Sequence, residues 1–344
     1  MKKAILFSVS LVFLLSILTG CGGQKEVSTS SDKDKTYTIR FAHAYSTAAQ
    51  HHKVVTWYKE QVEKRSNGKI KVDIYPAAQL MPIDQEISAI LDGRIQADLT
   101  VTSTIANLDP SAYIFDMPFL FNTTPGDLSK LKKFVKSETF KNQVIKKFEQ
   151  KGLKVWPAVT DDAATFNTTS KAVAKADDVA GLKMRILGGR YAEQVAKALG
   201  YSAVTISGAE LPTALMQGTV DGAITYPIYI RDSKLPLKNV SLIPLNYQAV
   251  CPLNMSATFY NSLPKDLQKV LDDVGNEMFD WAAKEVESKV NDALKDMEQN
   301  MGIKVIKLPD QEMAKLKEKV SPIWDKFAQD VSGGKQLIEE AKKL

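Results

Sequence analysis

One long helical pattern constrains the fold of this chain more than any other feature. From residue 262 to about residue 300, apolar side chains recur with the period of an α-helix, and after Pro264 only Gly275 interrupts them. The recurring positions are Leu267, Leu271, Val274, Met278, Trp281, Val286, Val290 and Leu294. At 1.5 Å per residue such a helix is roughly 45 to 55 Å long, which exceeds the width of one small domain. The pattern therefore predicts a helix that packs against two lobes.

Short strand-like and helical segments alternate along the rest of the chain. Helical patterns cover residues 47–66 and 83–91, and Ser207 with Glu210 forms a capping box for a helix through Met216. Strand patterns occupy residues 37–44, 70–75, 97–103, 154–159, 182–187, 202–206 and 256–260. The alternation is typical of α/β layers, so we expect an α/β fold with mixed or mainly parallel sheets.

A lysine-rich stretch, residues 129–154, predicts one further helix with a solvated basic face. Its apolar residues have helical spacing and are expected to face the core: Leu131, Phe134, Phe140, Val144, Ile145 and Phe148.

The N-terminus has the pattern of an export signal. A basic start is followed by an apolar run that is too short for a comfortable membrane span, then by small residues and Cys21. The sequence Leu-Thr-Gly-Cys at 18–21 resembles a bacterial lipobox, which implies a signal peptide at 1–20 and a lipidated Cys21; the alternative is an ordinary signal peptide that happens to contain a cysteine. Residues 21–35 are polar and predict a flexible tether. With Cys21 acylated, Cys251 has no partner and is expected to be a buried small hydrophobe.

Composition and motifs argue against several classes of protein. The net charge is +5, and removing Lys2 and Lys3 with the leader leaves +3, which makes no case for nucleic acid. Motifs for nucleophilic catalysis, phosphate binding or dinucleotide binding are missing, so the case for an enzyme or a cofactor is weak. His43, His51 and His52 fall in one window, but neighbours on a helix diverge by ~100°, so we expect no metal site.

Paired acids, Asp161 and Asp162, follow the strand pattern at 154–159. They could contact a cationic group of a ligand. Aspartates also bond their own downstream backbone in turns, and this is the interpretation that we favour.

An arginine stands in the middle of the short apolar strand at 182–187. Alternation places Leu182, Met184 and Ile186 on one face and Lys183, Arg185 and Leu187 on the other. If Arg185 faces a cleft, its planar fork of donors matches a carboxylate, and it stays charged at any physiological pH. The alternative is an internal bridge from Arg185 to an aspartate.

Six segments, in order, resemble the solute-binding proteins of tripartite ATP-independent periplasmic (TRAP) transporters, of the DctP type. They are IRFAHAYS at 39–46, VEKRSNGKIKVDIYPAAQL at 62–80, DMPFLF at 116–121, ADDVAGLKMRI at 176–186, ALMQGTVDGA at 214–223 and SLPKDLQKVL at 262–271. The resemblance covers nearly all of the chain after the tether. It implies a two-lobed, periplasmic-binding-protein-like fold, joined by crossing strands and one long helix, with a ligand cleft between the lobes. It also implies that Arg185 forms a salt bridge with the carboxylate of the ligand.

Two departures from the family pattern bear on the ligand. Thr165 stands where many members carry a second arginine, and residues 223–226 read Ala-Ile-Thr-Tyr in place of the more polar Gln-Glu-Asn run. We therefore expect one carboxylate, or a sulfonate, on a hydroxyl-bearing, apolar or aromatic body. The expected ligand-binding residues are Arg185, Tyr45, Ser103, Thr165, Phe166, Thr225 and Tyr226.

The resemblance also implies the domain division and the role of the protein. We expect one lobe from residues 36–161 with about 250–290, a second from 162–249 with about 291–330, and a C-terminal tail at 331–344. The chain would be a receptor, held to the membrane by its N-terminal lipid, that captures a small organic acid and delivers it to a TRAP permease for uptake driven by an ion gradient. The alternatives are a component that presents its ligand to a membrane sensor and, less favoured, a cleft enzyme, for which Asp161 and Asp162 lack a visible partner.

Overall fold

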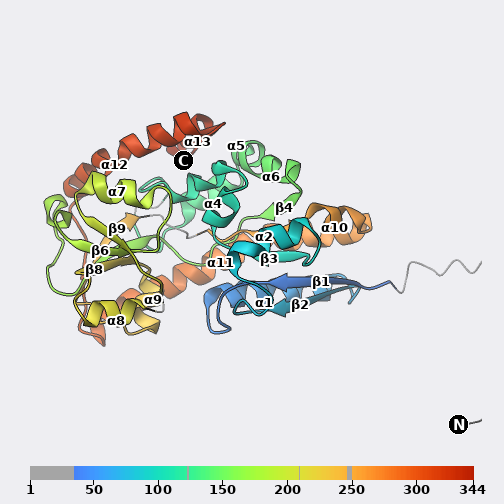
Figure 1. Cartoon of the computed structure of the whole chain (residues 1–344), viewed down its shortest axis with the longest axis horizontal. Helices are drawn as coiled ribbons and strands as arrows, with labels where there is room; N and C mark the ends of the chain where they lie inside the picture. The colour runs from blue at the N-terminus through green and yellow to red at the C-terminus, as the bar shows by residue number, and fades with distance from the viewer. Residues whose placement is uncertain (1–34, 122–123, 209, 246–249) are drawn as a thin grey trace, which may run out of the picture. The chain divides into compact units, whose positions relative to one another are not determined.

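Two β-sheets organise the chain in a computed structural model that describes residues 35–121, 124–208, 210–245 and 250–344 (Figure 1). The expected signal peptide and Cys21 lie outside these residues. The first sheet has the strand order β2-β1-β3-β10-β4, and we call the elements around it the first lobe. Its strands are β1 (Tyr37–Ala42), β2 (Ile70–Tyr75), β3 (Ala97–Leu99), β4 (Leu153–Trp156) and β10 (Leu253–Ser256).

The second sheet has the strand order β11-β9-β5-β8-β6-β7, and we call the elements around it the second lobe. Its strands are β5 (Ala164–Thr168), β6 (Lys183–Ile186), β7 (Ser202–Thr205), β8 (Gly222–Thr225), β9 (Asn239–Leu245) and β11 (Lys304–Ile306). The fold is thus α/β with two sheets.

Both sheets are mixed, and the chain passes between them three times: from β4 to β5, from β9 to β10, and through helix α11 (Lys265–Gln299) to β11. Strand β1 is parallel to β2 and β3, whereas β10 is antiparallel to β3 and β4. In the second sheet β6 is parallel to β7 and β8, and β5 is antiparallel to β8 and β9. The strands that enter a sheet directly from the other one, β5 and β10, are those with antiparallel neighbours on both sides. It follows that β1, β3 and β4 end at one edge of the first sheet, and that β5 begins where β6 and β8 end.

Helices surround the two sheets. They are α1 (Gln50–Arg65), α2 (Ile83–Leu91), α3 (Thr102–Ala106), η2 (Pro110–Asp116), α4 (Ser129–Val135), α5 (Glu138–Phe140), η3 (Lys141–Ile145), α6 (Lys146–Gln150), η4 (Ala176–Val179), α7 (Ala192–Leu199), α8 (Leu211–Met216), α9 (Pro227–Asp232), α10 (Ala257–Ser262), α11 (Lys265–Gln299), α12 (Asp310–Asp330) and α13 (Gly334–Lys343). Helix α13 lies within the expected C-terminal tail and packs against η2, α4 and α5.

Two predicted elements are wrong. Residues 256–260 form the start of helix α10 instead of a strand, because the Ser256 hydroxyl accepts a hydrogen bond from the Phe259 amide and caps the helix. The stretch 129–154 is broken into α4, α5, η3 and α6, and the Ser137 hydroxyl caps a new start by accepting from the Phe140 amide. Its apolar residues nevertheless face inward as predicted, with Ile145 only partly buried.

The long helix is present as predicted. Helix α11 spans 35 residues and packs against α1 and β4 of the first lobe and against α9 and β11 of the second (Figure 1). Its predicted apolar face is buried at Leu271, Val274, Met278, Val286 and Val290, among others. Burial of one continuous apolar stripe against two sheets makes this helix part of both cores.

A close approach between α11 and β4 requires a glycine. A methyl group at Gly275 would lie 2.5 Å from ring carbons of Trp156, a distance that Cβ atoms essentially never show. The indole of Trp156 is itself buried, so a shift of the ring would disturb the packing contacts that it makes.

We therefore predict that Gly275→Ala destabilises the protein by about 1–3 kcal/mol, although alanine is the better helix former. The measurement is urea unfolding followed by circular dichroism. Asn276→Ala, at the neighbouring exposed position of the same helix, is the control and should change the free energy of unfolding by no more than about 0.5 kcal/mol. A Gly275→Ala protein as stable as the control would show that α11 and Trp156 do not meet in this way.

A buried polar cluster lies in the first lobe between α2, β3 and β10. The Asn254 amide donates to Asp98 Oδ1 at 2.7 Å, while both carboxyl oxygens of the fully buried Glu86 have no hydrogen-bond partner in the described part of the chain. Burial, with a smaller effect from Asp98, raises the pKa of Glu86 to about 9. Glu86 is therefore protonated in the native protein at neutral pH.

Because the pKa of Glu86 is higher in the folded protein, this residue lowers stability as the pH rises from about 4.5 to about 9. Over that interval the unfolded chain releases the proton and the folded protein keeps it. We predict that Glu86→Gln reduces the loss of unfolding free energy between pH 5 and pH 8 by on the order of 1–3 kcal/mol. Urea unfolding at the two pH values measures it. The exposed Asp84→Asn on the same helix should leave the loss unchanged; an equal effect of both substitutions would contradict the assignment to Glu86.

Candidate functional site

The ends of strands from both sheets carry the candidate site. Tyr45, Ser103 and Asp161 follow β1, β3 and β4, which end at one edge of the first sheet. Arg185 lies near the end of β6, and Tyr226 follows β8 directly. Carboxyl ends of parallel strands are where α/β proteins place ligand-binding groups, because the following loops converge there. Both sheets therefore supply side chains suited to one site.

Arg185 is buried and is not paired with an acid. Only 1% of the residue is exposed, and its Nε donates to the Ile206 carbonyl at 2.8 Å. Among the described residues, no carboxylate forms a salt bridge with it, and its buried Nη2 has no hydrogen-bond partner. The alternative of an internal bridge to an aspartate is thus wrong. Burial lowers the pKa of Arg185, and Tyr229 and Tyr226 oppose this effect. The guanidinium stays charged, and its unused N–H groups are suited to an anion from outside the chain.

The strand that carries Arg185 departs from simple alternation. Lys183 and Leu187 are exposed, as their shared face suggests, but Arg185 between them is covered. The sequence pattern therefore shows that Lys183, Arg185 and Leu187 share one face of the strand. It does not show that other elements bury the middle residue of that face.

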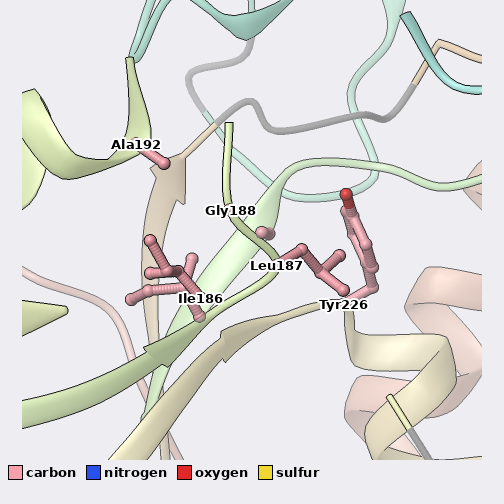
Figure 2. A pocket seen from close by; sticks show the side chains of 7 residues that line it. Ile186, Leu187, Gly188, Ala192 and Tyr226 are labelled. Atoms are coloured by element: carbon pink, nitrogen blue, oxygen red, sulfur yellow. The ribbon is translucent and has the colours of Figure 1, made fainter. Parts of the chain in front are cut away.

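A small apolar pocket lies at the same edge of the second sheet, beside Tyr226 (Figure 2). Figure 2 shows the Tyr226 ring next to Leu187, with Ile186 and Ala192 on the other side of the pocket. The residues that line it are Ala164, Ile186, Leu187, Gly188, Ala192, Ile224 and Tyr226. Its volume is about 10 Å³, which is room for about one water molecule, so the pocket by itself does not hold a ligand.

Tyr226 follows β8 of the second lobe directly and is buried. Burial raises the pKa of its phenol well above the usual value, Asp161, Cys251 and Asp116 raise it further, and Arg185 lowers it. The phenol therefore stays neutral at physiological pH.

First-lobe side chains surround Asp161. The Tyr45 ring stacks on His51 with centroids 3.6 Å apart, and the Tyr45 hydroxyl lies 3.9 Å from Cys251 Sγ. His51 Nε2 lies 3.9 Å from Asp161 Oδ2. Burial, with a smaller effect from His43, lowers the pKa of His51 to about 3, and burial with Asp162 raises that of Asp161 to about 8. Near neutral pH both groups are mainly uncharged, so this contact is no ion pair.

Asp161 and Asp162 differ in role. The Asp162 carboxylate accepts a hydrogen bond from the distant Gly126 amide, which ties two loops together. Asp161 makes no hydrogen bond to its downstream backbone among the described residues. The favoured turn interpretation is therefore wrong for Asp161, and its position after β4, at the edge that carries Tyr45, is the signal that could have identified it.

The remaining expected residues lie at the second sheet or on α3. Thr165 pairs with Thr225, and its fully buried hydroxyl bonds within the sheet to Asn167 Oδ1 and the Thr225 carbonyl. Phe166 is buried and packs edge to face on Tyr201. Ser103 is half-buried in the first turn of α3. Contacts among the described residues bring Tyr45 together with His51, Asp161 and Cys251. Of these, the sequence pattern indicated Tyr45 as ligand-binding and Asp161 as a less favoured alternative.

Cys251 and the histidines complete the description of the site. Cys251 is fully buried, as predicted, and burial raises its pKa to about 12, so it remains a thiol.

His43 Nε2 lies 3.0 Å from His52 Nδ1. Within the described ranges, no group of three or more His, Cys, Asp or Glu side chains could hold a metal ion. In the same ranges, no helix combines the length and apolar character that a membrane crossing requires.

Comparison with known proteins gives consistent matches over most of the chain. A C4-dicarboxylate-binding periplasmic protein, DctP, of Rhodobacter capsulatus is 26% identical over 313 residues, which are 88% of this chain and 90% of that protein. A TRAP periplasmic solute-binding protein of Ochrobactrum anthropi, solved with its C-terminus in the ligand-binding pocket, has a TM-score of 0.81 and 26% identity over 90% of this chain and 96% of that one. The sugar-acid-binding protein DctPAm of Advenella mimigardefordensis, in complex with galactonate, has a TM-score of 0.73 and 26% identity over 90% and 99% of the two chains.

The sequence pattern of one family matches residues 41–330 and is described as bacterial extracellular solute-binding protein, family 7. This match covers well over half of the chain, and β1 is the one described strand that begins before it. The chain therefore belongs to family 7 of the bacterial extracellular solute-binding proteins, the DctP family, whose members are binding proteins of transporters and not enzymes.

Proposed function

We propose that the chain binds the carboxylate of a small organic acid at Arg185 and delivers the acid to the membrane permease of a TRAP transporter. The observation that carries this proposal is the buried guanidinium of Arg185, which has an unpartnered Nη2 and no salt bridge among the described residues. A buried cation of this kind is stabilised by an anion that enters the site. The relatives support the choice of anion, since one is named for C4-dicarboxylates and another holds galactonate.

Binding by Arg185 alone is too weak for a receptor. A hydrogen bond to a charged group contributes about 1.5–3 kcal/mol, whereas micromolar affinity requires about 8 kcal/mol. The remainder would come from burying the body of the ligand and from excluding water around Arg185.

We infer a ligand with one anionic group at this site in preference to a diacid. Thr165 occupies the position where many family members carry a second arginine, and its hydroxyl is bonded within the second sheet. A second carboxylate would find no guanidinium there.

We also propose that the exported chain is held at the membrane surface by a lipid on Cys21. The lipobox pattern at 18–21 supports this. Firm anchoring would require more than one acyl chain on the cysteine, because a single chain gives only marginal membrane binding.

We predict that Arg185→Ala weakens binding of a carboxylate ligand at least about tenfold, since it removes a hydrogen bond to a charged group. Arg185→Lys should give an intermediate loss, because lysine keeps the charge without the planar fork. The ligand is first found by a thermal-shift screen of mono- and dicarboxylates, sugar acids, sulfonates and amino acids, and affinities are then measured by calorimetry.

The matched control is Lys183→Ala, which removes an exposed cation from the same strand and should leave the affinity unchanged. Circular dichroism verifies that each variant is folded. Binding by folded Arg185→Ala within twofold of the unmodified protein would exclude Arg185 as the carboxylate-binding residue.

A further inference from the structure

We propose that the protein has a second binding site, in the first lobe, for a small aromatic acid that carries an N–H group beside its carboxylate, such as an N-acylated aromatic amino acid. The site is a cavity of about 450 Å³, within the range of about 300–1,000 Å³ that small-molecule sites occupy. It lies between β4, helix α11 and the segment from α4 to η3. Arg185 and the other residues of the candidate site do not line it, so this inference goes beyond the proposed function.

One wall of the cavity is the free edge of strand β4. Residues 154–157 line the cavity, and β4 is the last strand of the first sheet. The Ala257 amide donates to the Gly152 carbonyl at 2.9 Å, so these two residues form a hydrogen-bonded pair at the start of the ladder between β4 and β10. Backbone groups of successive residues point to opposite sides of a strand, so the N–H and C=O of Val155, three residues further on, point away from β10. Neither group has a hydrogen-bond partner among the described residues.

Aromatic side chains form the apolar walls of the cavity. Phe140 of α5, Trp156 of β4 and Phe279 of α11 all line it and are otherwise buried. Because aromatic rings pack well edge to face or offset on one another, three rings from three elements favour a ligand with an aromatic body. Lys141 and Ile145, which bound the π-helical turn η3, also line the cavity. Such turns are rare and occur often at functional sites.

The charged groups around the cavity favour an anion. Three lysines line it, Lys136, Lys141 and Lys154, against one acid, Asp272. The Asp272 carboxylate is already paired, because it lies 3.2 Å from Lys154 Nζ and accepts a hydrogen bond from the Tyr260 hydroxyl at 2.6 Å. The other two lysines form exposed salt bridges with acids that do not line the cavity. Bridges of this kind contribute little to stability, so these ammonium groups can turn toward a bound carboxylate.

The edge of β4 suits a small molecule better than a strand of another protein. Lys154 and Pro157 stand on this edge, and lysine and proline are the residues that protect sheet edges from pairing with further strands. Pro157 also has no N–H group to donate. Val155 is therefore the residue that offers both a donor and an acceptor to the cavity, which matches a partner the size of a single residue.

These features together define how the ligand would bind. Its carboxylate accepts a hydrogen bond from the Val155 N–H and is attracted by the lysines, while its own N–H donates to the Val155 C=O. This is the way in which one residue of an added strand pairs with a sheet edge. The aromatic ring of the ligand then lies among Phe140, Trp156 and Phe279.

The test compares three probes of similar skeleton by calorimetry. N-acetyl-L-phenylalanine has the ring, the N–H group and the carboxylate, N-acetyl-L-phenylalaninamide lacks the charge, and 3-phenylpropionate lacks the N–H group. We expect N-acetyl-L-phenylalanine to bind at least about fivefold more tightly than either of the others, because each of those lacks one of the two groups that the cavity recognises.

A blocking variant locates the probe in the cavity. Asn276 is an exposed residue of α11 that lines the cavity, so Asn276→Trp should fill it and lower the affinity for N-acetyl-L-phenylalanine at least about tenfold. Lys284→Trp, at an exposed position of the same helix outside the cavity, is the matched control and should leave the affinity within about twofold. Circular dichroism verifies that each variant is folded.

A charge variant tests the role of the lysines. The double variant Lys136→Ala and Lys141→Ala should weaken binding of N-acetyl-L-phenylalanine at least about threefold and leave binding of the uncharged amide unchanged. The matched control is the double variant Lys133→Ala and Lys146→Ala, which removes two exposed lysines that lie close by in the sequence and do not line the cavity. It should leave the affinity for both probes unchanged.

Several outcomes would overturn the inference. They are the absence of saturable binding of N-acetyl-L-phenylalanine up to about 10 mM, equal binding of the three probes, unchanged affinity in Asn276→Trp, and equal effects of the two double lysine variants. Arg185→Ala separates the two sites and should leave this binding within about twofold. If folded Arg185→Ala lost the probe instead, the probe would bind at Arg185, which would exclude the second site and support the carboxylate site of the proposed function.

Discussion

The pairing of the two crossing segments is the interaction on which the arrangement of the site depends. After β4 the chain passes into the second lobe, and before β10 it returns, and the two passages pair at Val159 and Val250. The Cys251 amide also donates to the Ala158 carbonyl at 2.9 Å. This short ladder holds Asp161 and Cys251 within a few residues of the point where the lobes are joined. Side chains of both lobes can therefore approach one ligand.

The buried guanidinium of Arg185 is unusual because no acid in the described part of the chain pairs with it. A protein usually pairs its buried charges internally, because an unpaired charge away from water is costly. Here the Arg185 guanidinium is held in place by one carbonyl, and the described residues give it no partner of opposite charge. Under the proposed function, an anionic ligand would supply the missing charge, and the cost of the unpaired cation would become a gain in affinity.

Local sequence signals predicted the elements that are long or regular. They failed where contacts with neighbouring residues determine whether a segment is a helix or a strand. The apolar period of α11 extends over many turns, so no tertiary contact was needed to recognise it. The stretch from 256 to 260 looks like a strand by composition, yet the Ser256 cap and the end of β10 make it a helix. Strands β5, β8 and β9 were not predicted, because short strands that are buried on both faces show little alternation. Strand β11 was not predicted because it has only three residues, at the edge of the sheet.

By itself, the sequence determined the class of fold and the long helix that belongs to both lobes, because each is encoded in a local pattern. It also singled out Arg185, whose role as the carboxylate-binding residue stays a prediction. Only the tertiary structure decided which distant side chains meet. Tyr45 and His51 are far from Asp161 and Cys251 along the chain, and they come into contact because parallel strands end at one edge and two segments cross together. Tertiary structure also decided that Arg185 has no acidic partner among the described residues, since this depends on every element that packs around it. Proximity and burial are properties of the folded chain, and no local pattern specifies them.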